Sequence, residues 1–155
     1  MDIWHIRLFG SLRVSRGEEE FFRFSTRKTG TLLAFLAFHA DQRHTREVLC
    51  DLLWPDDPPQ TSRARLRVAL TSLRHQLEPP GVSSGSVIRS QGHEQVQLVT
   101  GAVATDVAEV ERALRVLSDP SGSPRDAQVA AGQRIVSFFP EPLLTGFYDD
   151  WVITE

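Results

Sequence analysis

Apolar and polar residues alternate in the first part of the chain. Between residues 3 and 9, one face of an extended segment collects Trp4, Ile6 and Leu8, and the other collects Ile3, His5, Arg7 and Phe9. A period of two predicts a β-strand. Turn residues around Gly10 and Gly17 follow, so we expect an antiparallel meander with shorter strands near residues 12–14 and 21–24.

The pattern then becomes helical. We expect a first helix from Thr26 to about His39, and a second from a Thr45 N-cap to about Trp54. The expected buried side of the second helix consists of Val48, Leu49, Leu52 and Leu53. The sequence PDDPPQ predicts a rigid exposed loop. A third helix then begins with Thr61 or Ser62 as its cap and ends at about Leu77.

The third helix, residues 61–77, separates leucines from arginines. At 100° per residue, one side collects Leu66, Leu70, Leu73 and Leu77, and the opposite side collects Ala64, Arg67, Val68, Thr71, Ser72 and His75. Arg63 and Arg74 flank one border and Arg65 the other, with no acidic residue in the segment. The leucines are expected to anchor the helix, and the arginine-bordered face is expected to point outward.

A hairpin and a second helical part follow the third helix. Segments 87–89 and 95–99 read as strands joined by a turn that contains Gly92. Two further helices are expected near residues 106–117 and 126–138, the first with an apolar side at Val107, Val110, Leu114 and Leu117. The part from residue 101 onward is acidic, with 9 Asp and Glu against 4 Lys and Arg, whereas residues 1–100 carry 13 basic and 11 acidic residues.

Composition narrows the class of protein. With 155 residues, 41% hydrophobic and 24% charged, the chain has the composition of a globular protein. Its longest apolar run, residues 32–38, is too short to span a membrane, and no signal-peptide pattern begins the chain, so a cytoplasmic protein without membrane contact is expected. Its single cysteine, Cys50, excludes an internal disulfide and a multi-cysteine metal site.

The sequence offers little support for a catalytic site. Asp149 and Asp150 are consecutive, so they are more typical of a helix N-terminus than of a carboxylate pair that acts on one substrate. Cys50 lies on the interior side of its helix and lacks an evident base. No glycine-rich phosphate loop is present. We therefore expect a protein that is not an enzyme and uses no cofactor or metal.

The order of strands, three helices and hairpin is that of a winged helix-turn-helix, whose second packed helix enters the DNA major groove. This predicts an α+β fold and double-stranded DNA as the partner. Arg67 and Thr71 are the candidates for base edges, and His75 shares their face. The phosphate candidates are Arg63, Arg65, Arg74 and, in the hairpin, Arg89, while His93 at the hairpin tip is placed to reach the minor groove.

Two alternatives remain open at this point. Arg74 could pair with Glu47 or Asp51 on the second helix in place of DNA. The whole domain could also be a winged-helix protein–protein interaction module that does not bind DNA. The lack of acids along the third helix argues against the second alternative.

Several sequence stretches resemble the N-terminal half of SARP-type (Streptomyces antibiotic regulatory protein) bacterial activators. They are IRLFGSLRV, TRKTGTLLAFLAFH, the LLW-P motif at residues 52–55, ARLRVALTSLR at 64–74, DVAEVERAL and GFYDDW at 146–151. The resemblance implies an OmpR-type winged-helix DNA-binding domain at residues 1–101. Residues 102–155 would then begin a helical, tetratricopeptide-like bacterial transcriptional activation domain.

The same resemblance implies a function and partners. Such activators bind promoter direct repeats, with two copies side by side, and recruit RNA polymerase. In this sequence, Asp56 and Asp57 of the proline loop become candidate polymerase contacts, although the residues alone favour ordinary turn positions. The family's activation domain is usually much longer, so we expect either a fragment or a naturally short regulator.

Overall fold

The N-terminal sheet lies in the middle of the molecule. The computed structural model describes residues 2–40, 42–119, 121–138 and 141–153. The sheet has the strand order β3-β2-β1-β7, with β7 parallel to β1 and the other pairs antiparallel, and its strands are β1 (Trp4–Arg7), β2 (Arg13–Arg16), β3 (Glu19–Phe21) and β7 (Val103–Thr105). The predicted meander is confirmed, but its third strand is shifted, since it was expected at residues 21–24 and lies at Glu19–Phe21. The sequence did not predict β7.

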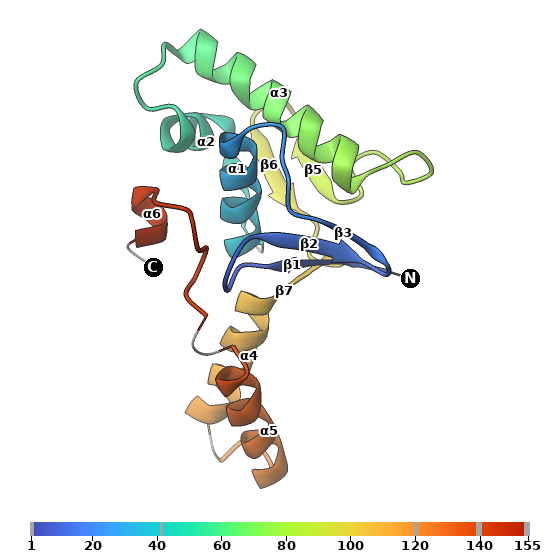
Figure 1. Cartoon of the computed structure of the whole chain (residues 1–155), viewed down its shortest axis with the longest axis vertical. Coiled ribbons are helices and arrows are strands. Elements are labelled where there is room, and N and C mark those ends of the chain that lie inside the picture. Colours follow the sequence, from blue (N-terminus) through green and yellow to red (C-terminus); the bar gives the residue numbers. More distant parts are fainter. Residues whose placement is uncertain (1, 41, 120, 139–140, 154–155) are drawn as a thin grey trace.

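Three helices lie on one side of this sheet (Figure 1): α1 (Arg27–Phe38), α2 (Arg46–Leu53) and α3 (Pro59–Leu77). Thr26 and Thr45 cap the first two, since each side-chain oxygen accepts a hydrogen bond from the backbone N–H three residues later. The expected start of α3 at Thr61 or Ser62 was wrong. The helix begins at Pro59, because proline is well tolerated in the first helical turn, where its missing N–H has no helical partner.

A second sheet forms the wing. Its strand order is β4-β6-β5, with β4 (His44–Thr45), β5 (Ile88–Gln91) and β6 (Gln95–Leu98) all antiparallel. The β5–β6 hairpin was predicted, and Gly92 in its turn has a φ of 60°, a conformation that glycine adopts without strain. The short β4 was not predicted. It ties the hairpin directly to the start of α2.

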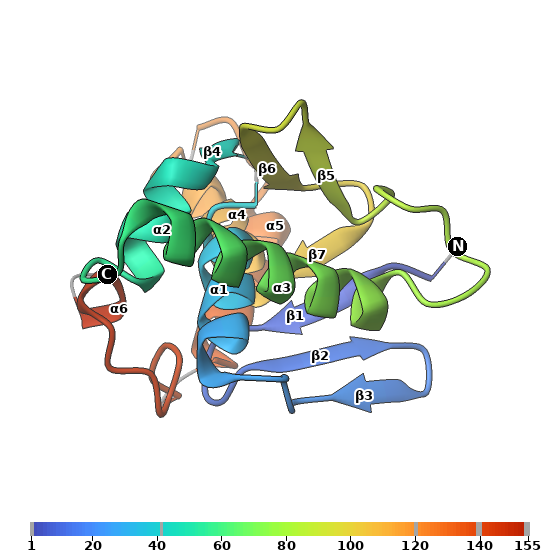
Figure 2. The same ribbon diagram turned by 90° about the horizontal axis from the view of Figure 1, so that it is seen from above.

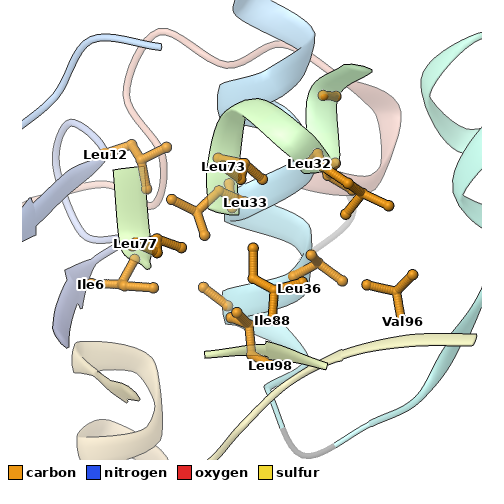
Figure 3. Close-up of a cluster of buried hydrophobic side chains, with 14 of the residues drawn as sticks. Ile6, Leu12, Leu32, Leu33, Leu36, Leu73, Leu77, Ile88, Val96 and Leu98 are labelled. Atoms are coloured by element: carbon orange, nitrogen blue, oxygen red, sulfur yellow. The ribbon is translucent and has the colours of Figure 1, made fainter. Parts of the chain in front are cut away.

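The core lies between the helices and the two sheets (Figure 3). Leu66, Leu70, Leu73 and Leu77 of α3 are all buried, as predicted, and pack with Leu32, Leu33 and Leu36 of α1 and with Ile88 and Leu98 of the wing. Each such leucine contributes roughly 1.5–3 kcal/mol on burial. Other burial predictions were wrong, since Val48 on α2 and Leu114 and Leu117 on α4 are exposed.

The second helical part lies on the other side of the N-terminal sheet. Helices α4 (Asp106–Ser118) and α5 (Arg125–Val136) pack together at the far end of the molecule from α3 (Figure 1). The buried Asp106 carboxylate joins α4 to the sheet, because it accepts hydrogen bonds from the backbone N–H groups of Leu8 and Phe9, at 2.9 Å each.

The chain then returns to the winged helix. Residues 141–152, which we call the strap, run from α5 back to α6 (Asp150–Ile153) beside α1 (Figure 1). The backbone N–H of Gly10 donates to Pro142, and those of Leu144 and Thr145 donate to Leu8 and Gly10. The expected α+β winged helix with an appended helical segment is thus confirmed. The proposed division at residues 101 and 102 stays a prediction.

Candidate nucleic-acid interface

Helix α3 lies on the outside of the molecule, with the β5–β6 hairpin beside it (Figure 2). Its leucines face the core, and Arg63, Arg67, Thr71 and His75 are exposed on the outer side. Ser72 is used internally, since its hydroxyl donates to Ser25 Oγ at 2.9 Å. The outer surface of α3 is therefore a row of basic and small polar side chains, and the buried leucines on the opposite side of the helix pack against the core.

Two contacts fix the hairpin relative to α3. The Glu78 carboxylate, directly after the helix, accepts hydrogen bonds from the N–H groups of Gly85, Val87 and Ile88, each at 2.9 Å. The Arg74 guanidinium donates to Ser90 Oγ on β5. The alternative pairing of Arg74 with Glu47 or Asp51 was wrong, because among the described residues the guanidinium donates to Ser90 and forms no ion pair.

A hollow of about 510 Å³ lies where α2, α3 and the hairpin turn meet. Its lining includes Arg63 and Arg67 of α3, His93 of the turn and Arg46 of α2, with the acids Glu47 and Glu94 also present. We call Arg46, Arg63 and Arg67, together with Arg74, which lies outside the lining but whose charge acts on Arg46, the arginine cluster. The structure thus brings together three of the residues singled out from sequence, Arg63, Arg67 and His93, around one concave surface.

Sequence reasoning missed Arg46, the first residue of α2. Its backbone N–H donates to the Glu94 carbonyl of the hairpin turn at 2.7 Å, and its Nε is buried without a hydrogen-bond partner among the described residues. Burial, followed by the positive charges of Arg74 and Arg67, lowers the pKa of Arg46 from its ordinary value. Arginine is always protonated at neutral pH, so Arg46 carries a positive charge beside those of Arg67 and Arg74.

Arg65 lies on the other border of α3 and has a different environment. Its guanidinium is 2.9 Å from an Asp57 carboxylate oxygen, so these two candidate residues pair with each other. Asp56, in the same proline loop, is exposed. Arg65 also lines a separate, mainly apolar hollow with Trp54 and Val68. It is not brought together with the arginine cluster.

Arg89 occupies the outer face of the hairpin. It is paired in register with Gln97, whose side-chain oxygen accepts a hydrogen bond from Arg43 at 3.1 Å. Because neighbouring strand residues alternate between faces, Arg89 points away from the face that carries Ser90 and α3. The Thr71 hydroxyl donates to the Arg67 carbonyl at 2.9 Å, which leaves its oxygen able to accept a further bond.

Comparison with known proteins agrees with this geometry. Residues 24–93 match the family model described as "Transcriptional regulatory protein, C terminal". That match contains α1, α2, α3 and the hairpin up to His93, and so nearly all of the surface described above. Comparison with curated proteins gives no match.

A solved structure has a similar fold. It is Mycobacterium tuberculosis EmbR in complex with a low affinity phosphopeptide, with a TM-score of 0.78 and 16% sequence identity. The likeness covers 99% of this chain and 41% of that chain, so the present chain spans about two-fifths of the EmbR length. The family match indicates a transcriptional regulatory domain over residues 24–93, and the solved structure shows that the fold is shared.

Other kinds of site find no support in the part of the chain that the structure describes. No three His, Cys, Asp or Glu side chains there are grouped so that they could hold a metal ion. Cys50 is buried with a free thiol. No helix there combines the length and the apolar character needed to cross a membrane.

Proposed function

We propose that this protein is a sequence-specific transcriptional regulator that inserts α3 into the DNA major groove. The observation that carries the proposal is the arginine cluster, which borders the exposed face of α3 and lies beside the hairpin. The major groove is about 12 Å wide and admits one helix. The outer face of α3 has small residues between its arginines, so its backbone can approach the base edges closely.

The side chains divide by the part of DNA that they would contact. Arg67 and Thr71, one turn apart, read base edges, and His75 lies further along the same face. Arg63 and Arg74 contact phosphates next to the helix, while His93 reaches the backbone or minor groove from the hairpin tip. Arg65 and Arg89 are directed away from this surface, so their contribution to DNA affinity is expected to be small.

Fluorescence anisotropy with mixed-sequence duplex DNA across a salt series tests whether the chain binds DNA. Affinity should fall linearly with the logarithm of salt concentration, and Arg63→Ala should make the slope shallower. Arg65→Ala is a matched control from the same helix, and its slope should remain close to that of the wild type. No binding at low salt would refute DNA binding and favour an interaction module.

Arg67→Ala tests base recognition once an operator has been selected from random duplexes. A bidentate contact to a guanine contributes roughly 1–3 kcal/mol of discrimination against the wrong base. The variant should therefore lose about tenfold or more in affinity for the operator but much less for mixed-sequence DNA. Equal binding of the operator by the wild type and the variant would remove Arg67 from base recognition.

We further propose that the regulator is an activator of the SARP type. The resemblance of residues 52–55, 64–74 and 146–151 supports this class, with two copies side by side on direct repeats and RNA polymerase as the recruited partner. The exposed Asp56 is the better polymerase candidate, since Asp57 is already paired with Arg65. Analytical ultracentrifugation with DNA that carries one or two repeats would measure the stoichiometry.

A further inference from the structure

The hollow where α2, α3 and the hairpin turn meet is lined by three arginines and two glutamates, so its positive charges outnumber its negative ones. Arg63 and Arg67 form no ion pair among the described residues, and Arg46 lies close enough to Arg67 and Arg74 for their charges to disfavour its own. Glu47 and Glu94 also line the hollow, but neither is within ion-pair distance of these arginines. Like charges held together cost stability unless a ligand of opposite sign occupies the site.

One of the residues that line the hollow also carries a buried donor without a partner among the described residues. The Nε of Arg46 has no hydrogen-bond partner among the described residues, and a buried N–H without an acceptor costs about 1–3 kcal/mol. Native proteins satisfy nearly all such groups, so an orphaned donor calls for an explanation. An anion seated in the hollow would neutralise the charges around it and would accept hydrogen bonds from the guanidinium groups that line the hollow.

The hollow is also rigid. β4 pairs His44 and Thr45 with Val96 and Gln95 of the hairpin, and the Arg46 N–H donates to the Glu94 carbonyl at 2.7 Å. The start of α2 and the hairpin turn are therefore joined by backbone hydrogen bonds. Donors from both elements can meet one ligand without moving.

We propose that this hollow is a seat for a single DNA backbone phosphate, with Arg46 as its central donor. The seat is shared by the start of α2, the exposed side of α3 and the hairpin turn. A phosphate bound there would fix how far α3 enters the groove and where along the duplex the hairpin lies. Arg46 is thus a positioning residue that reads no base, and the DNA part of this inference rests on the proposed function.

Arg46→Gln is the main test. The variant should bind mixed-sequence duplex about tenfold more weakly at low salt, because it loses a charge-assisted hydrogen bond to phosphate. The slope of log affinity against log salt should fall by about 0.9, as expected for one phosphate contact. Arg46→Lys keeps the charge and should recover the slope, although it cannot supply the parallel N–H groups of a guanidinium.

Stability distinguishes this role from a structural one. Because Arg46→Gln removes a cation from a cluster of cations, its melting temperature should equal or exceed that of the wild type. Arg125→Gln, which removes an exposed arginine at the start of α5, is the matched control and should change neither the slope nor the affinity. A lower melting temperature for Arg46→Gln, with DNA affinity reduced only in proportion to the unfolded fraction, would overturn the proposal.

A second measurement does not depend on DNA. The Arg Nε–Hε signals of ¹⁵N-labelled protein are followed by NMR while inorganic phosphate is added. The Arg46 signal should shift with saturation, and the Arg125 signal should not. If both signals move alike, or the Arg46 signal stays still, the seat does not exist.

The two experiments separate the two proposals. If the wild-type chain binds duplex DNA and Arg46→Gln binds it with the same affinity and slope, the seat is refuted while DNA binding stands. If the wild-type chain does not bind DNA at all, the proposed function fails. The phosphate titration then decides by itself whether the seat exists.

Discussion

Replacing Asp106 with alanine should separate α4 from the N-terminal sheet and lower stability measurably. Asp106 is 8% exposed, and its carboxylate oxygens accept hydrogen bonds from the backbone N–H groups of Leu8, Phe9 and Val107, all at 2.9 Å. The contacts with Leu8 and Phe9 span almost a hundred residues of sequence. The carboxylate thus holds the end of β1 against the start of α4.

The magnitude follows from the donors that the substitution leaves unpaired. The N–H groups of Leu8 and Phe9 would lose their acceptor, at about 1–3 kcal/mol each, whereas that of Val107 lies at a helix start. Part of this loss is offset, because the variant no longer buries a carboxylate. We therefore expect Asp106→Ala to lower the free energy of unfolding by about 3 kcal/mol at neutral pH.

The loss should also depend on pH. Burial raises the pKa of Asp106 in the folded protein, and the backbone hydrogen bonds from Phe9, Leu8 and Val107, with Arg7 nearby, oppose the shift only in part. Between about pH 3.9, the ordinary value for aspartate, and the raised pKa, the folded chain holds a proton that the unfolded chain has released. The contribution of Asp106 is therefore complete below that window and declines as the pH rises through it.

Urea unfolding of wild type and Asp106→Ala across this window measures both effects. The difference in free energy of unfolding should be largest at the acidic end and should shrink toward neutral pH. Asp126→Ala is the matched control, since it removes an exposed carboxylate from the first turn of α5 and should cost less than about 1 kcal/mol. A difference below 1 kcal/mol for Asp106→Ala, or one that grows with pH, would refute the reasoning.

Two further substitutions test the strap and the proline loop. Trp151→Ala should lower the free energy of unfolding by about 2 kcal/mol, because the half-buried indole packs edge-on against Phe35 and Phe38, with centroid distances of 5.4 and 6.4 Å. Urea unfolding measures this, with the exposed Tyr148→Ala as control. Asp56→Asn should reduce transcription by purified RNA polymerase without changing DNA affinity, and unchanged transcription would remove Asp56 as a polymerase contact.

Strong periodicity made the main elements predictable. The four leucines along α3 predicted a helix with one buried face, and the alternating residues of β1 predicted a strand with one buried face. Both predictions succeed because burial of one apolar face contributes most to the stability of each element. The cap at Thr45 was also predicted from the sequence, and the first helix was expected to begin at Thr26. The start of α3 was not, since the prolines that suggested a loop include one in the first helical turn.

Features that depend on tertiary contacts escaped sequence reasoning. β4 and β7 are only two and three residues long, too short to show a period, and exist because neighbouring strands pair with them. Leu114 and Leu117 follow an amphipathic pattern but remain exposed, because a pattern does not supply a covering partner. Arg46 is at least seventeen residues from the rest of the arginine cluster, so only the packing of α2 against α3 reveals it.

The charges along one border of α3 are paired, and those along the other are not. This difference explains how a chain of net charge −3 would bind DNA. On the side of the proline loop, Asp57 pairs with Arg65, and Asp149 of the strap pairs with Lys28. On the hairpin side, the arginine cluster has no ion-pair partner among the described residues. Because screened charges act over only about 10 Å, local imbalance matters more than the net value. The positive field should therefore be concentrated between α3 and the hairpin, so DNA would approach there despite the acidic chain.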